Sequence, residues 1–186
     1  MRQWRKKRRQ ASRNMSRKYQ LIALDMDGTV LNDKKEIDEE TRSAIHEALA
    51  AGVEVVFCTG RSFSEMRDIL KEFPDMHYLC SESGALVLDL QKGETLHREE
   101  VSREIAEIMM AAGKRKDLMT CVFSDGICCV KKEHMLHMDR YQMGQYQKMY
   151  EKTCNPMEEN VLEEPDASLF QATDRWILSR VNSLAK

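Results

Sequence analysis

Two aspartates one residue apart follow a short apolar run in the segment LIALDMDGTVLND, residues 21–33. On a continuous strand Asp25 and Asp27 would point to opposite faces, so they can share a site only where the chain turns, which Gly28 permits. Two close carboxylates resist joint ionisation unless a cation lies between them, and Mg²⁺ prefers such oxygen ligands. One carboxylate of such a pair can attack a phosphoryl group while the other transfers the leaving-group proton.

A second polar segment, Thr59-Gly60-Arg61, follows the next β-branched run. The Thr59 hydroxyl and the amides around Gly60 could hydrogen-bond a phosphate close to a helix N-terminus, where the helix dipole favours an anion. Arg61 adds positive charge. Asp-Gly is also a common turn dipeptide, so the alternative for the first segment is a turn with capping aspartates. The two segments together favour phosphoryl-transfer chemistry.

Strands and helices are predicted around these segments. Short apolar or β-branched runs predict strands at 21–24, 53–58 and 78–80, and the first is expected to be buried on both faces. Helices are predicted from an Asp38 N-cap to Gly52, and from a Ser62–Glu65 capping box to Phe73. This alternation predicts a parallel, doubly wound α/β sheet with right-handed crossovers, so both polar segments would lie at its carboxyl edge, where ligands bind.

The pattern changes after about residue 82. Hairpins are predicted at 85–101 and at 120–130, with an amphipathic helix at 102–113 between them. This order indicates an antiparallel α+β unit, so a domain boundary is predicted at 82–85. Residues 134–164 are expected to be partly helical, and the segment FQATDRWILSRVNSLAK that ends the sequence is expected to form a weak amphipathic helix at best.

The two motifs resemble those of a known family. Residues 25–31 resemble the first motif of the haloacid dehalogenase-like (HAD) hydrolases, and 57–61 resemble the second motif in the form found in Cof-type sugar phosphatases of subfamily IIB. The resemblance implies a partial Rossmann-like core at 19–82, an inserted α+β cap at 83–165 and an atypical tail at 166–186.

The resemblance also implies roles for individual residues. Asp25 would be the nucleophile and a ligand of Mg²⁺, and Asp27 would be the general acid/base and ligate the metal through its backbone carbonyl. Thr59 would bind the transferring phosphoryl group, assisted by amides near Met26 and Gly60. The expected activity is Mg²⁺-dependent hydrolysis of phosphorylated sugars or other small metabolites through an aspartyl-phosphate. Alternatives are a phosphotransferase using the same intermediate and a non-catalytic binding fragment.

The sequence departs from the family pattern by an absence. No Gly-Asp dipeptide occurs in it, whereas the family's fourth motif supplies a Gly-Asp-x-x-x-Asp loop and its third motif a lysine, both after the cap. The departure at 81–85, Ser-Glu-Ser-Gly-Ala in place of the family's Asn-Gly-Ala, is small. The expectation is therefore a truncated or frameshifted hydrolase.

Composition limits the location and the partners. Residues 1–18 hold nine of the 29 Lys and Arg residues and no acid, leaving 20 basic against 31 acidic groups in the other 168 residues. This leader is expected to be disordered, Met15 is an alternative start, and nucleic acid is an unlikely partner. No segment is typical of a membrane span or a secretory signal, so a cytoplasmic protein is predicted. The six cysteines are expected to be reduced, and the oligomeric state is not indicated.

Overall fold

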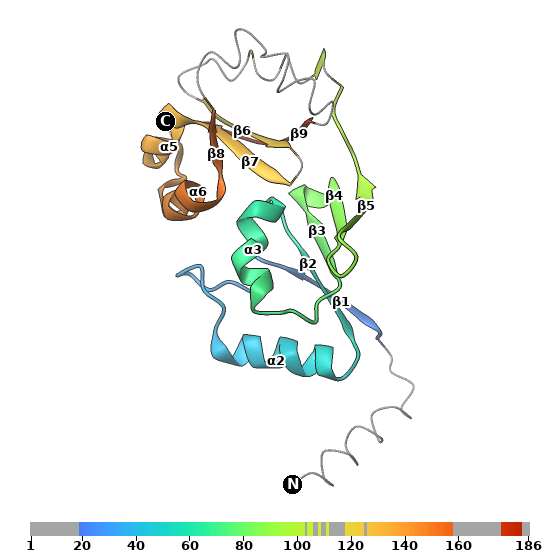
Figure 1. Ribbon diagram of the computed structural model, residues 1–186. Coiled ribbons are helices and arrows are strands. Elements are labelled where there is room, and N and C mark those ends of the chain that lie inside the picture. The colour runs from blue at the N-terminus through green and yellow to red at the C-terminus, as the bar shows by residue number, and fades with distance from the viewer. Residues whose placement is uncertain are drawn as a thin grey trace, which may run out of the picture.

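The computed structural model describes residues 19–102, 118–124, 126–157 and 176–183, and single positions at 104, 105, 108 and 111. Strands β1 (Leu21–Asp25), β2 (Glu54–Cys58) and β3 (Tyr78–Ser81) form a parallel arrangement. Helix α2 (Glu39–Ala50) connects β1 to β2, and helix α3 (Phe63–Lys71) connects β2 to β3 (Figure 1). The predicted parallel α/β class is confirmed.

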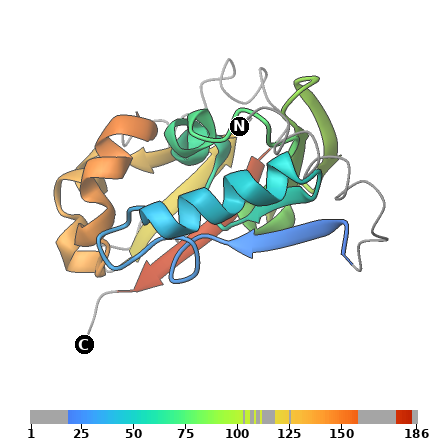
Figure 2. The ribbon, with the colours of Figure 1, turned by 90° about the horizontal axis from the view of Figure 1, so that it is seen from below.

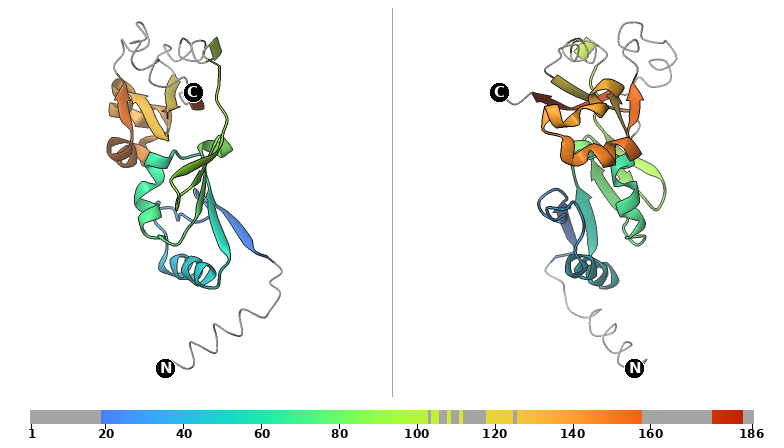
Figure 3. Two further views of the ribbon diagram at one scale, coloured as in Figure 1. Left: turned by 45° about the vertical axis from the view of Figure 1, so that its right-hand side comes forward. Right: turned by 90° about the vertical axis from the view of Figure 1, so that its left-hand side faces the viewer.

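Strand order fixes where the strand ends meet. The order β1-β2-β3 advances in one direction, so right-handed crossovers place both helices on the same face of the sheet, as Figure 3 shows. Asp25 pairs in register with Cys58, and Cys58 pairs with Cys80. The carboxyl ends of the three strands are therefore level, and the loops that follow them share one edge.

Strand β1 is more exposed than predicted. The expectation that it is buried on both faces is wrong, since Leu21 is 54% and Ile22 is 38% exposed. The reason is its position: β1 is the edge strand of the first sheet in the described chain. The neighbouring strand β2 is the more buried strand, since its Val55 and Phe57 are at most 1% exposed.

The first sheet continues past β3. The short η1 helix (Glu82–Gly84) leads into β4 (Leu86–Asp89) and β5 (Glu94–Arg98), which add antiparallel strands in the order β1-β2-β3-β4-β5. The first predicted hairpin is thus confirmed, and its strands belong to the same sheet as the parallel strands. The domain boundary at 82–85 stays a prediction.

A second sheet contains the other predicted hairpin. Strands β6 (Leu118–Ser124), β7 (Ile127–Lys131), β8 (Asn155–Met157) and β9 (Trp176–Ser183) lie in the order β8-β7-β6-β9. The β6–β7 hairpin is confirmed. The expectation of a weak helix in the final segment is wrong for β9, because its backbone pairs antiparallel with the whole of β6. The predicted helix at 102–113 and the leader at 1–18 lie largely or wholly outside the described residues.

Short helices accompany the second sheet. The predicted partial helicity of 134–164 is confirmed by α5 (Lys132–Leu136), η2 (Met138–Tyr141), η3 (Gly144–Tyr146) and α6 (Gln147–Thr153). This helical group lies next to α3, which α6 contacts (Figure 1), whereas α2 lies in the foreground when the molecule is seen from below (Figure 2). In the described part of the chain, no helix is long and apolar enough to cross a bilayer.

The two sheets meet at the start of α3. The amide of Ser64 donates to the carbonyl of Gly126 at 2.8 Å, and the Ser64 hydroxyl accepts from the amide of Cys128 at 3.3 Å. Gly126 has a φ of +77°, and a Cβ there would lie 3.0 Å from the Phe63 Cβ. The turn between β6 and β7 therefore needs glycine both for its backbone conformation and for its approach to α3.

Removing the α3 cap should cost measurable stability. Ser62 is fully buried and forms the predicted capping box, with its hydroxyl and amide both donating to Glu65 Oε2. We expect Ser62→Ala to lower the free energy of unfolding by about 1 to 2 kcal/mol, measured by urea denaturation. Ser43→Ala, on the exposed face of α2, is the control and should change stability by less than about 0.5 kcal/mol. Equal stability of the two variants would contradict a role for the cap.

Candidate functional site

The turn after β1 is held by its own backbone. The Met26 carbonyl accepts from the amides of Thr29, Val30 and Leu31 at 3.3, 3.1 and 2.8 Å. The Met26 side chain is fully buried, and Gly28 has a φ of +85°, a conformation in which glycine has no steric penalty. Burial of Met26 anchors the turn between the two aspartates.

A cleft of about 290 Å³ opens beside the end of β1. It is lined by Asp25, Cys58, Thr59, Gly60, Cys80, Ser83 and Gly84. Asp25 is exposed and accepts a 3.4 Å hydrogen bond from the Thr29 hydroxyl. The loops at the ends of β1, β2 and β3 thus bring together Asp25, Thr59 and Gly60, three of the residues that the motifs singled out.

Hydrogen bonds hold the loop that follows β2, residues 59–61, in place. Thr59 is 5% exposed; its amide donates to the Cys80 carbonyl and its own carbonyl accepts from the Ser83 amide, each at 2.9 Å. The Thr59 hydroxyl accepts from the Arg61 amide at 3.1 Å. Ser83 adopts a left-handed conformation with a φ of +58°. These bonds fix the Thr59 side chain and the Gly60 peptide at the cleft.

Asp27 lies in a different environment from Asp25. Its carboxylate accepts from Arg61 Nε and Nη2, both at 2.9 Å, and from Lys35 Nζ at 3.1 Å. Burial raises the pKa of Asp27, but hydrogen bonds and charge from Arg61, followed by those from Lys35, outweigh it and lower the pKa below the ordinary value. Asp27 is therefore held as a carboxylate, and the Arg61 side chain binds this aspartate instead of lining the Asp25 cleft.

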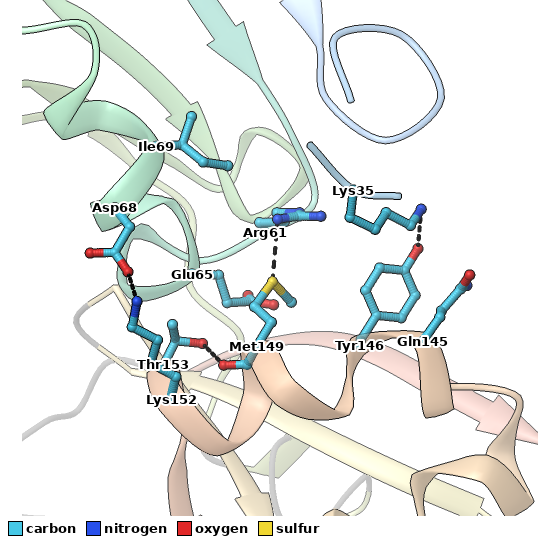
Figure 4. Close-up of a pocket in the computed structure, with 10 residues that line it drawn as sticks. All are labelled: Lys35, Arg61, Glu65, Asp68, Ile69, Gln145, Tyr146, Met149, Lys152 and Thr153. Atoms are coloured by element: carbon cyan, nitrogen blue, oxygen red, sulfur yellow. Dashed lines mark hydrogen bonds and ion pairs between the residues drawn. The ribbon is translucent and has the colours of Figure 1, made fainter. Parts of the chain in front are cut away.

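A second cavity, of about 230 Å³, lies between α3 and the η3–α6 segment. Figure 4 shows its lining: Lys35, Arg61, Glu65, Asp68, Ile69, Gln145, Tyr146, Met149, Lys152 and Thr153. Lys35 Nζ donates to the Tyr146 hydroxyl at 3.3 Å and lies 4.9 Å from the centre of its ring, and Arg61 Nη1 donates to the Met149 sulfur at 3.2 Å. Both cations that hold Asp27 thus also contact the helical group of the second sheet.

Sequence reasoning did not identify Lys35 or Tyr146 as site residues. Lys35 belongs to a polar loop and has a φ of +63°, and Tyr146 lies 111 residues away in sequence. The local signal was the lysine pair at 34–35, which ends three residues before the Asp38 N-cap. Nothing in that pattern indicates which lysine turns back towards Asp27.

Asp68 on α3 forms ion pairs with Lys71 and with Lys152 of α6, and these pairs make the stability of the fold depend on pH. Hydrogen bonds first from Lys152 and then from Lys71 lower the pKa of Asp68 from 3.8 to about 2. Because the pKa of Asp68 is lower in the folded than in the unfolded state, its carboxylate stabilises the fold at pH values above about 4. This stabilisation is lost as the pH falls from about 4 to about 2. We expect Asp68→Asn to be less stable than wild type at pH 6, with the difference vanishing near pH 2 in urea denaturation. The control is Asp75→Asn, in the loop after α3; a difference that persists unchanged at pH 2 would contradict the ion-pair origin.

The fold and the cleft together define an α/β protein with an exposed carboxylate, a buried threonine hydroxyl and a glycine peptide at the carboxyl edge of a parallel sheet. The model of the haloacid dehalogenase-like hydrolase family matches residues 22–179. The chain belongs to this family, as the two sequence motifs predicted.

Individual relatives share part of their length with this chain. The Bacillus subtilis (strain 168) protein YxeH is 42% identical over 91 residues, which are 47% of this chain and 32% of that protein. The HMP-PP phosphatase of Yersinia pestis (strain Pestoides F) is 32% identical over 107 residues, which are 58% of this chain and 39% of that protein. The matched segment thus spans about a third of each of these curated relatives.

A solved structure has the same fold. The subclass IIB sugar phosphatase BT4131 superposes with a TM-score of 0.61 at 14% identity, over 90% of this chain and 70% of that one. At this identity the likeness concerns the fold alone.

Proposed function

We propose that this chain carries the nucleophile and phosphate-binding part of a Mg²⁺-dependent phosphatase that acts on phosphorylated sugars or other small phosphorylated metabolites. The observation that carries the proposal is the cleft in which an exposed Asp25 faces Thr59 and Gly60 at the carboxyl edge of the sheet. Membership of a hydrolase family and the name of the Yersinia relative, a phosphatase, support the reaction class.

The chemistry would take place in two steps. In the first, an Asp25 carboxylate oxygen attacks phosphorus, the bond from phosphorus to the ester oxygen breaks, and the leaving oxygen takes a proton from Asp27. In the second, water attacks the aspartyl-phosphate, the bond from phosphorus to the Asp25 oxygen breaks, and Asp27 takes the proton from water. Thr59 and the Gly60 amide would bind the phosphoryl oxygens in both steps.

The environment of Asp27 suits one of these roles directly. Held by Arg61 and Lys35, it is a carboxylate with a lowered pKa, which is the state that a general base for the water step requires. The acid role requires a proton on the same group, so Arg61 or Lys35 must withdraw from it when substrate binds. Their contacts with Met149 and Tyr146 offer each cation an alternative partner at the second cavity.

The residues at the end of β1 fit a partial Mg²⁺ site. In the described part of the chain, no three His, Cys, Asp or Glu side chains are grouped to hold a metal. Mg²⁺, however, often uses only one or two protein carboxylates and completes its shell with water and substrate phosphate. The Asp25 carboxylate and the Asp27 carbonyl would hold the ion here, where it would neutralise charge on the transferring phosphoryl group.

The test is hydrolysis of p-nitrophenyl phosphate by the 186-residue chain. We expect p-nitrophenol and inorganic phosphate to be released in equal amounts with Mg²⁺ present, and both to stop when EDTA is added. Release of p-nitrophenol without phosphate, in the presence of an alcohol acceptor, would identify a phosphotransferase instead. Absence of both products at all Mg²⁺ concentrations would contradict the proposed activity of this chain.

A further inference from the structure

Two thiols lie side by side at the candidate phosphate-binding cleft. Cys58 ends β2, and its Cα is paired in register with that of Cys80 on the neighbouring parallel strand β3. Adjacent strands are about 4.8 Å apart, and paired residues project to the same face. Both side chains line the same cleft as Asp25.

The two thiols affect each other and remain accessible. Burial, followed by the charge and hydrogen bond of Cys80, raises the pKa of Cys58, and the charge of Asp25 adds to the effect. Each cysteine is free and only half-buried. Reagents in the cleft can therefore reach two thiols that are already in contact.

The other cysteines differ in their setting. Cys121, Cys128 and Cys154 also lie together, but they are at most 7% exposed, inside the hydrophobic core formed by β6, β7 and the helices that follow them. Cys129 is half-buried on β7, its register partners are Val122 and Asn155, and it lines neither of the two cavities described above. Among the six cysteines, Cys58 and Cys80 are thus the pair whose thiols contact each other and also line a cleft.

We propose that Cys58 and Cys80 form a chelating dithiol site for trivalent arsenic compounds, and that a bound arsenical occupies the cleft beside Asp25. Thiolate sulfur is a soft ligand that selects soft, thiophilic partners. An organoarsenous acid, R–As(OH)₂, reacts with two thiols to form two As–S bonds and release two water molecules, and arsenic stays trivalent. After the first bond forms, the second is intramolecular, which gives a chelate that a monothiol displaces poorly.

The test measures the adduct by intact mass of the full chain treated with phenylarsine oxide and then with excess 2-mercaptoethanol. We expect one phenylarsenic group per wild-type chain to survive the monothiol and to be removed by dimercaptopropanol, which is itself a dithiol. Cys58→Ser and Cys80→Ser should each lose the resistant adduct, whereas Cys129→Ser, the control, should keep it. A resistant adduct on the Cys58→Ser/Cys80→Ser double variant, or none on wild type, would overturn the proposal.

A second measurement needs no variant. Tryptic digestion of the wild-type adduct should yield peptide 43–61 joined through arsenic to peptide 72–92, because these peptides contain Cys58 and Cys80 respectively. A link between any other pair of cysteine peptides would contradict the assignment. Both readouts are independent of catalysis, so this proposal can fail or succeed whatever the outcome of the phosphatase assay.

Discussion

Asp25→Asn is expected to reduce Mg²⁺-dependent hydrolysis of p-nitrophenyl phosphate by ~10⁴-fold or more, because loss of a covalent nucleophile removes the pathway on which the other groups act. The amide that replaces the carboxylate has nearly the same size but neither its charge nor its nucleophilicity. The Asp25 side chain is exposed at the cleft and accepts a long hydrogen bond, 3.4 Å, from the Thr29 hydroxyl, so the fold should tolerate the change.

The control for this variant is Asp33→Asn, which removes an exposed carboxylate from the same loop outside the cleft. Its rate should stay within about twofold of wild type, since surface substitutions away from a site have small effects. Circular dichroism of each variant checks that the fold is intact. Hydrolysis by Asp25→Asn at the wild-type rate would exclude Asp25 as the nucleophile.

Arg61→Met is expected to lower the free energy of unfolding by about 2 to 3 kcal/mol at pH 7, because hydrogen bonds to charged groups contribute about 1.5 to 3 kcal/mol. Arg61 is 4% exposed and makes two hydrogen bonds to Asp27. Methionine keeps most of the aliphatic packing but leaves Lys35 as the only described cation bonded to Asp27.

The same variant should change the dependence of stability on pH. Because the pKa of Asp27 is lower in the folded state than the ordinary value of 3.8, its carboxylate stabilises the fold at pH values above 3.8. This stabilisation is lost as the pH falls through the folded-state pKa. Without Arg61 that pKa rises and the contribution shrinks. The difference between Arg61→Met and wild type should therefore be largest near neutral pH and smaller below about pH 4, as measured by urea denaturation.

Arg42→Met is the matched control. Arg42 likewise bonds carboxylates, those of Glu39 at 2.7 Å and Glu72 at 2.8 Å, but on the more exposed surface of α2. Exposed ion pairs contribute little to stability because solvent screens them, so Arg42→Met should destabilise the fold much less than Arg61→Met. If Arg61→Met and Arg42→Met proved equally stable, the Arg61–Asp27 pair would have no special structural role.

Much of the fold followed from short segments of sequence. The capping box at Ser62 and Glu65, the glycine after α2 and the β-branched run of β2 are local signals, because each acts within a few residues of the chain. The parallel order of β1, β2 and β3 then followed from the alternation of strand and helix. The meeting of Asp25 with Thr59 and Gly60 was predictable for the same reason, since parallel strands end at one edge.

Errors arose where burial or pairing depends on distant neighbours. An apolar run such as 21–24 predicts a strand, but its exposure depends on which strand lies on its other side. The segment at 176–183 has a weak pattern of its own, and it becomes a strand through pairing with β6, more than 50 residues earlier. The hydrogen bonds between β6 and β9 depend on both segments, so neither segment alone predicts them.

The sequence by itself determined the residues that could do chemistry and the sheet edge at which they lie, because strand period and turn residues act locally. Tertiary structure alone decided that Asp27 faces Arg61 and Lys35 while Asp25 faces the cleft. It also decided that Lys35 meets Tyr146 and that Cys58 lies beside Cys80. Apart from the Asp27–Lys35 pair, which is eight residues apart, these contacts join residues 22 to 111 positions apart. Only the docking of whole elements brings such segments together.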